Sequence, residues 1–262
     1  LLTEAGLVER ASEGAWVFYR LPRTDTVERR LAESALAMLD RDDPILARDM
    51  ERLDEIKAAR DAAARAYFER NADDWNRLRA LHLPEADIES AILAAAGPGP
   101  FEHMVDVGVG QGRMIQLFAD RVRRAEGFDT SRQMLAIARA ALDDLHAKAA
   151  VQFGDAYAPP IDAGAADLVT IHQVLHFLAD PARAVAEASR LLRRGGRMVI
   201  VDFAPHALEF LREDHAHRRL GFGDDEVSGW CANAGVAGLS ITTLAPRKKA
   251  QLTVKIWAGD KA

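Results

Sequence analysis

The stretch that most constrains the fold runs from His103 to Arg113 and reads HMVDVGVGQGR. Valines at 105 and 107 alternate as in a β-strand, glycines follow at 108, 110 and 112, and an apolar helical pattern begins at Met114. This order predicts a strand, a tight glycine turn and a helix start. Such a turn brings bare backbone N–H groups and a helix N-terminus against a ligand.

Strand and helix patterns alternate through the rest of the chain. We expect strands at 103–107, 123–128, 149–153, 167–172, 197–203, 239–245 and 251–258, and helices at 84–96, 112–121, 131–147, 181–193 and 224–234. This alternation predicts an α/β fold with a doubly wound, mostly parallel sheet. Only the short stretch 246–250 separates the last two strands, so they should pair as an antiparallel hairpin.

The first eighty residues have a different pattern. Gly6 predicts a helix end, followed by a hairpin with strands at 7–10 and 15–21 and a turn at 12–14. Residues 24–80 contain no glycine and are rich in Ala, Leu, Glu and Arg, which predicts helices. Asp42 or Asp43 should cap the second of these, with Pro44 at its first position. We therefore divide the chain into regions 1–22, 23–75 and 76–262.

Composition excludes several classes of protein. The 262 residues are about half apolar and carry a net charge of −6, which gives no global sign of nucleic-acid binding. The single cysteine, Cys231, excludes an intrachain disulfide or a Cys-rich metal site and favours a cytoplasmic location. No apolar run reaches the length of a membrane span. The chain begins with Leu1 rather than Met, so we expect it to start partway into a longer product.

Three details of the glycine turn argue against a dinucleotide ligand. The glycine spacing is G-x-G-x-G, and Arg113 stands where the dinucleotide fingerprint places Gly or Ala. Asp106, two residues before Gly108, would repel a pyrophosphate but would suit an ammonium group. Asp129 follows about twenty residues on, where a carboxylate accepts hydrogen bonds from ribose hydroxyls.

The region from about residue 65 to the C-terminus resembles class I S-adenosylmethionine-dependent methyltransferases of the ubiquinone/menaquinone type. The resemblance rests on five ordered motifs, VDVGVGQGR (105–113), EGFDTSRQML (126–135), FGDA (153–156), ADLVTIHQVLHFLADP (166–181) and LLRRGGRMVIVDF (191–203). It implies a Rossmann-like seven-stranded sheet and S-adenosyl-L-methionine as cofactor. Methyl transfer from a sulfonium needs positioning rather than a metal, and we expect no metal site.

The resemblance also implies which residues serve the site. The predicted cofactor-binding residues are Tyr67, Asp106, Gly108, Gly110, Asp129, Thr130, Met134, Gly154, Asp155, Ala156, His172 and Gln173. His172 and His176 are the predicted catalytic residues, with a small molecule as acceptor. His176 has two interpretations: a general base facing the acceptor, or a buried, hydrogen-bonded histidine that holds its loop. The histidines at 206, 215 and 217 indicate a lid or acceptor-binding insertion rather than a metal site, because ligand spacing is poor.

Residues 1–21 resemble the end of the recognition helix and the wing of ArsR-type winged-helix repressors, through LLTEAGLV (1–8) and YRL (19–21). The resemblance implies a transcription regulator fused to a methyltransferase, truncated at its N-terminus, that binds DNA only with the missing part present. It also implies a homodimer through the helical region 23–75. An ordinary hairpin and a helical layer over the sheet are the alternatives. The alternative function is a regulator that senses S-adenosylmethionine or S-adenosylhomocysteine.

Overall fold

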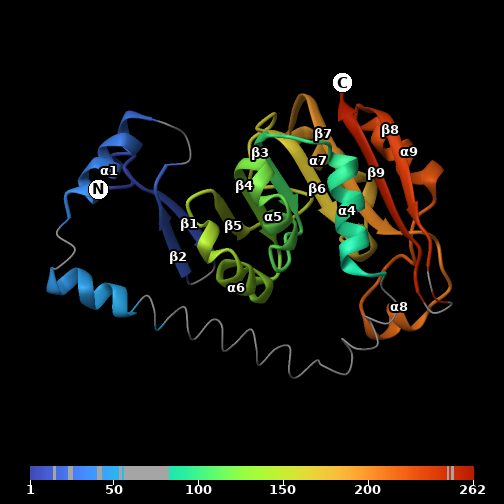
Figure 1. Ribbon diagram of the computed structural model, residues 1–262, viewed down its shortest axis with the longest axis horizontal. Helices are drawn as coiled ribbons and strands as arrows, with labels where there is room; N and C mark the ends of the chain where they lie inside the picture. The colour runs from blue at the N-terminus through green and yellow to red at the C-terminus, as the bar shows by residue number, and fades with distance from the viewer. Residues whose placement is uncertain are drawn as a thin grey trace. The chain divides into compact units, whose positions relative to one another are not determined.

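The computed structural model describes residues 1–13, 16–22, 26–39, 43–52, 55, 83–246, 248 and 251–262. The chain divides into two compact units, Leu1–Ala62 and Ala63–Ala262. The larger unit holds the seven-stranded sheet and the predicted glycine turn (Figure 1). The candidate site lies within this larger unit.

The first unit contains the predicted hairpin in a different register. Strands β1 (Glu9–Glu13) and β2 (Trp16–Arg20) pair antiparallel. Residues 12 and 13, expected in the turn, instead pair with residues 17 and 16 at the end of the ladder. Gly6 has a φ of +70°, as expected of a residue that ends a helical turn.

Two helices follow the hairpin in this unit. Helix α1 (Val27–Ala37) is capped by Thr26, whose Oγ1 accepts from the N–H of Arg29 at 3.2 Å. Residues 44–52 form the next helix. Its cap is Asp43, whose Oδ1 accepts from the N–H of Ile45 at 2.7 Å. Capping by Ser, Thr, Asp or Asn satisfies N–H groups that have no partner within the helix.

The second unit is built on a mixed sheet with the strand order β5-β4-β3-β6-β7-β9-β8. The strands are β3 (Phe101–Val107), β4 (Val122–Asp129), β5 (Ala149–Phe153), β6 (Ala166–His172), β7 (Leu192–Phe203), β8 (Val236–Leu244) and β9 (Val254–Lys261). The first five are parallel, and β9 pairs antiparallel with both β7 and β8. The seven strands and the antiparallel C-terminal hairpin were both predicted.

Helices cover both faces of this sheet. They are α4 (Glu85–Ala96), α5 (Arg113–Leu117), α6 (Arg132–Ala141), α7 (Pro181–Leu191), α8 (Phe210–Asp214) and α9 (Asp224–Asn233), with short 3-10 helices η1 (Ala119–Arg121), η2 (Asp143–Leu145) and η3 (Leu175–Phe177). Met104 and Val105 are neighbours in β3 but belong to separate apolar clusters. Successive side chains of a strand point to opposite faces, so each face has its own core.

Several boundaries differ from those predicted. Strand β7 begins at Leu192, where the sequence indicated the end of a helix, because Leu192 pairs with Ala166 before the ladder shifts register. The helix predicted at 131–147 ends at Ala141. Strand β8 begins three residues before the predicted strand and ends one residue before it, and β9 lies three residues after its prediction, with exposed Ile241 opposite buried Trp257. The alternation of apolar and polar residues along a strand does not show where the strand ends. The ends are set by which residues the folded sheet buries.

Candidate functional site

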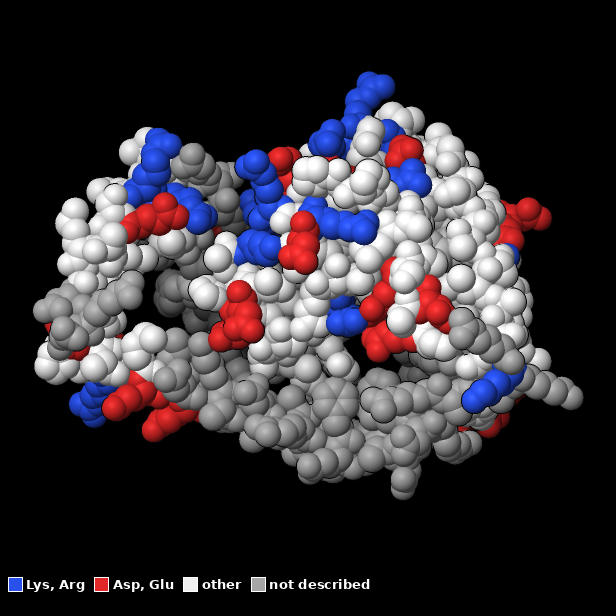
Figure 2. Space-filling view, in the orientation of Figure 1, with Lys and Arg blue, Asp and Glu red and all other residues white. Residues whose placement is uncertain are grey.

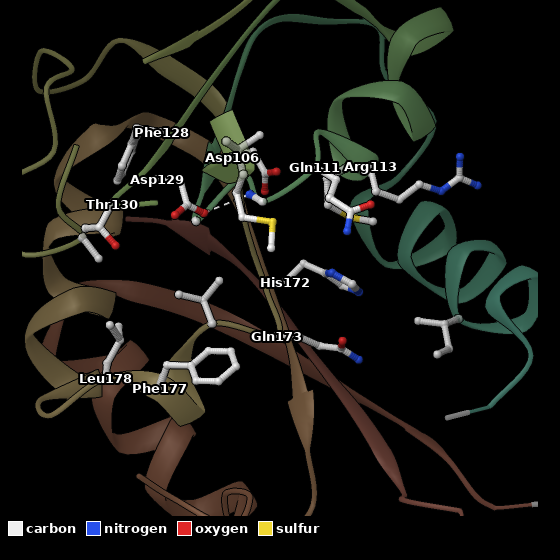
Figure 3. A pocket seen from close by; sticks show the side chains of 18 of the residues that line it. Asp106, Gln111, Arg113, Phe128, Asp129, Thr130, His172, Gln173, Phe177 and Leu178 are labelled. Carbon is white, nitrogen blue, oxygen red and sulfur yellow. Dashed lines mark hydrogen bonds between the residues drawn. The ribbon is translucent and has the colours of Figure 1, made fainter. Parts of the chain in front are cut away.

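A cavity of about 1050 Å³ opens at the carboxyl ends of the central parallel strands (Figure 3). This is where open α/β sheets place their ligands. It is lined by residues 83–85, 88, 89, 106, 108–111, 113, 114, 128–130, 134, 154–156, 172–174, 177, 178 and 251. Eleven of the predicted cofactor residues are among them: Asp106, Gly108, Gly110, Asp129, Thr130, Met134, Gly154, Asp155, Ala156, His172 and Gln173. The twelfth, Tyr67, lies outside the described residues.

The glycine turn after β3 is held by the neighbouring strand. The N–H groups of Gly108 and Val109 both donate to the carbonyl of Phe128 in β4, at 2.9 and 3.0 Å. Gly108 has a φ of +69°, and a Cβ on it would lie 2.4 Å from Val174 Cγ2. Only glycine combines this backbone conformation with so close a neighbour. The turn therefore lies directly against the end of β6.

Asp129 ends β4 and is fixed by two backbone donors. Its Oδ2 accepts from the N–H of Gly110 at 3.0 Å, and its Oδ1 accepts from the N–H of Ser131 at 2.8 Å. Ser131 in turn caps α6. The carboxylate thus joins the glycine turn to the start of α6 while it lines the cavity (Figure 3). Each oxygen has a further lone pair for a ligand hydroxyl.

Asp106 is the buried carboxyl of the site. It is 2% exposed and lies opposite Thr170 in the register of β3 and β6. Its Oδ1 accepts from Thr170 Oγ1 at 2.5 Å, and its Oδ2 makes no hydrogen bond to the described residues. Burial, opposed by the Thr170 hydrogen bond and assisted by nearby Asp129, raises the pKa of Asp106 to about 7. A ligand cation would favour its ionised form.

The end of β5 shapes the far side of the cavity. A Cβ on Gly154 would lie 2.6 Å from Pro160 Cδ and 3.1 Å from Phe128 Cβ, so this position has room only for glycine. Asp155 follows, and its Oδ1 accepts from the N–H of Tyr157 at 2.9 Å. This Asx-type turn fixes the carboxylate on the lining of the cavity.

His172 ends β6, Gln173 follows it, and both project into the cavity on the side facing α4 (Figure 3). Gln173 has a φ of +55°, a conformation that non-glycine residues adopt rarely. Its N–H donates to the carbonyl of Val201 in β7 at 2.8 Å. The neighbouring strand therefore holds Gln173 in this backbone conformation, which is often found at ligand sites.

His176 lies behind the cavity and is not among its lining residues. It is 2% exposed, and its Nδ1 lies 2.8 Å from Oδ1 of the fully buried Asp202. Its carbonyl accepts from the N–H groups of Arg218 and Arg219 at 2.8 and 3.2 Å. The ring packs 4.1 Å from that of Phe177, which does line the cavity. Of the two interpretations of His176, this position agrees with the buried, hydrogen-bonded histidine.

Two other histidines of the insertion after β7 lie near His176: His217 is buried and His206 is half-buried. The ring of His217 stacks on that of His176 at 4.1 Å, and burial, with His176, lowers the pKa of His217 to about 3. Burial and His176 also lower the pKa of His206. Within the described part of the chain no group of His, Cys, Asp and Glu has an arrangement suited to a metal ion.

Some residues of the site were not found from the sequence. Thr170 contacts Asp106 from 64 positions away in the sequence. Asp202 of β7 contacts His176 of η3 from 26 positions away. Arg113 lines the cavity, and its Nε donates to Glu89 of α4 at 2.6 Å. These pairs depend on strand register and helix placement, which sequence spacing alone does not fix.

Residues 105–200 match a family model described as a methyltransferase domain. This part of the chain is therefore similar to a methyltransferase domain. An uncharacterized methyltransferase of Mycobacterium tuberculosis is 34% identical over 127 residues, covering 48% of each chain. A demethylmenaquinone methyltransferase of Thermus thermophilus is 34% identical over 106 residues, covering 40% of this chain and 48% of that one. The chain thus matches about half the length of these curated relatives.

Solved structures show the same fold as the methyltransferase domain. The YcgJ protein of Bacillus subtilis has a TM-score of 0.56 at 18% identity, covering 66% of this chain and 97% of that one. Phosphoethanolamine N-methyltransferase 2 of Haemonchus contortus, solved with S-adenosyl-L-methionine, has a TM-score of 0.58 at 16% identity and covers 67% of this chain and 52% of that one.

These comparisons support the methyltransferase domain and not the N-terminal interpretations. The matched family region starts at residue 105, and nothing found supports a winged helix, DNA binding, transcription regulation or a fusion to a regulator. No helix among the described residues is long and apolar enough to span a membrane.

Proposed function

We propose that the chain binds S-adenosyl-L-methionine in this cavity and transfers its methyl group to a small-molecule acceptor. The observation that carries the proposal is the joint placement of Asp106 and Asp129 beside the glycine turn, at the carboxyl ends of adjacent strands. Such a pair matches a ligand that presents an ammonium group and a ribose diol. A dinucleotide pyrophosphate would be repelled from the same place.

The residues present fit this cofactor. Oδ2 of Asp106 has no hydrogen bond to the described residues and can accept from an ammonium group. Gly108 and Gly110 line the cavity, where their backbone would face the methionyl part. Asp129 and Thr130 would hold the ribose, and Met134, Gly154, Asp155 and Ala156 would enclose the adenine. Tyr67 remains a predicted contact to the methionyl carboxylate.

When bound, S-adenosylmethionine supplies a methyl group already activated by a sulfonium. The protein's task is then to orient the acceptor, exclude water and accept a proton. His172 lines the cavity and is the proposed base. For His176 the structure favours the second interpretation of the sequence, because Asp202 and the backbone of residues 218–219 fix it behind Phe177. We propose that His176 positions the η3 loop.

A calorimetric titration tests cofactor binding. We expect wild-type protein to bind S-adenosylhomocysteine, and Asp129→Ala to weaken that binding at least tenfold, because hydrogen bonds to a charged acceptor contribute about 1.5–3 kcal/mol. Asp120→Ala, an exposed aspartate of η1, is the matched control and should leave the affinity unchanged. Equal affinity in wild type and Asp129→Ala would remove Asp129 from the ribose site.

The N-terminal unit supports a second proposal, a homodimer formed through region 23–75. Helix α1 has no buried residue, and its Leu31, Leu36 and the following Met38 are exposed. An amphipathic helix usually buries its apolar stripe against a neighbour. This interface remains a prediction.

A further inference from the structure

The lining of the cavity extends beyond the residues assigned to the cofactor. Pockets for small ligands usually have volumes of about 300–1,000 Å³, and this one measures about 1050 Å³. If the proposed function holds, the cofactor takes the part beside Asp106 and Asp129. His172 and Gln173 project toward α4, away from Asp129 and Thr130 (Figure 3). The remaining space, between the end of β6 and α4, is the acceptor compartment.

The charges of the lining are strongly unequal. Five acidic residues line the cavity, namely Glu85, Glu89, Asp106, Asp129 and Asp155, and Arg113 is the single Lys or Arg among the described lining residues. The three aspartates are assigned to the cofactor under the proposed function. Arg113 is therefore the one described cation that could bind an anionic acceptor.

Arg113 is already paired. Its Nε lies 2.6 Å from Oε1 of Glu89, and the same nitrogen lies 3.4 Å from Oε1 of Glu85. Glu89 is the more buried of the two carboxylates. Figure 2 shows acidic side chains gathered over one end of α4 with basic atoms beside them. The positive charge of Arg113 is therefore already neutralised by carboxylates of the same lining.

The other side chains of the compartment carry no fixed charge. Gln111, His172, Gln173 and Gln251 offer hydrogen bonds, and Leu83, Ile88, Val174 and Phe177 are apolar. A carboxylate or phosphate placed here would lose its hydration without gaining a counter-ion, which is unfavourable. A cationic acceptor would be repelled by the sulfonium that must approach it.

We propose that the acceptor is an uncharged molecule with an apolar body and a hydrogen-bonding group, and that the Arg113–Glu89 pair excludes anionic acceptors. The amides and His172 bind the polar group, and the apolar side chains pack on the body. Glu89 is then a specificity-determining residue, although it acts through Arg113 and not by contact with the reacting atoms.

Matched ligands of different charge test this proposal. The full chain is saturated with sinefungin, an analogue whose amine carries a positive charge in place of the sulfonium, and titrated with two triplets: tyrosol, 4-hydroxyphenylacetate and tyramine, and tryptophol, indole-3-acetate and tryptamine. We expect the uncharged member of a triplet to bind at least tenfold more tightly than its charged partners, and to lose that binding in Gln173→Gly. Preference for a charged member, or no binding by any of the six, overturns the proposal.

A variant that removes the carboxylate partners of Arg113 provides a second test. Replacing Glu85 and Glu89 by Gln keeps the side-chain shapes and frees Arg113, so 4-hydroxyphenylacetate and indole-3-acetate should gain at least tenfold in affinity. The matched control is Glu102→Gln, whose carboxylate pairs with Arg123 at 3.3 Å on an exposed surface and which should change nothing. Absence of a gain in the double variant also overturns the proposal.

The two proposals fail separately in these experiments. If S-adenosylhomocysteine does not bind to the wild-type chain, the proposed function is wrong. If it binds and the anionic members are preferred, the cofactor assignment stands and only the inference about the acceptor is lost.

Discussion

Gly108 shows how a single residue can determine both the fold and the site. Its φ of +69° and the 2.4 Å from its hypothetical Cβ to Val174 Cγ2 mean that any side chain requires Val174, just after β6, to move. The backbone N–H of Gly108 is already bonded to Phe128 in β4. Gly108 is therefore in contact with the end of β4 and with Val174, and it also lines the cavity.

We expect Gly108→Ala to lower the unfolding free energy by about 2–4 kcal/mol, as backbone strain and overpacking add together. Cofactor binding should fall with it, because the turn would move away from the ligand. Urea unfolding and calorimetry measure the two effects. Gly195→Ala is the control: its φ is +71° but nothing lies within 4 Å of a Cβ, so only the strain of about 1 kcal/mol remains. Equal losses in both variants would contradict the close approach.

At the scale of elements, the buried pair of His176 and Asp202 joins η3 to β7. Asp202 is fully buried and also accepts from the N–H of Phe203 at 2.9 Å. The carbonyl of His176 adds the backbone at Arg218 and Arg219. Three segments far apart in sequence are thus held behind Phe177, the residue that lines the cavity.

Asp202→Asn should therefore destabilise the protein by about 1.5–3 kcal/mol, the usual contribution of hydrogen bonds to a charged group. Hydrogen exchange should show lost protection at residues 175–178 and 217–222. Glu187→Gln, which breaks the exposed pair with Arg190, should cost at most about 1 kcal/mol. An Asp202→Asn protein as stable as the control would show that the pair does not hold the loop.

Much at this scale was predictable. Alternating valines and the glycine spacing gave the strand–turn–helix at 103–118, because periodicity reports local structure directly. The order of motifs placed Asp106, Asp129 and Asp155 on one cavity. A buried His176 was one of two interpretations of the sequence, but its partner Asp202 was not predictable, because it lies 26 positions away on another strand. The same is true of Thr170 and of Glu89, whose contacts arise from tertiary packing.

At the scale of the whole molecule, the exposed apolar side chains of α1 bear on oligomeric state. We expect sedimentation to show a dimer of wild-type protein, and Leu31→Glu with Met38→Glu to give a monomer, since charges on an apolar interface are costly to bury. Ile241→Glu alters a partly exposed residue of β8 and is the control, which should remain a dimer. A monomeric wild-type chain at tens of micromolar would exclude the interface.

The pH dependence of stability reflects two groups whose pKa values the fold shifts, Asp106 and His217. The pKa of Asp106 is raised from 3.8 to about 7, so between these values the folded chain holds a proton that the unfolded chain has lost. Stability from this group therefore falls as pH rises through that window. The pKa of His217 is lowered from 6.5 to about 3, so the unfolded chain holds the extra proton and stability rises with pH.

Between pH 4.5 and 6 the two groups oppose each other, and single variants should separate them. Relative to wild type, Asp106→Asn should gain stability as pH rises, and His217→Phe, which keeps the ring stacking, should lose it. Each slope should approach about 1.4 kcal/mol per pH unit, and the double variant should run parallel to wild type. Urea unfolding across this range measures all four proteins. Parallel curves for the single variants would show that neither group is held in its uncharged form by the fold.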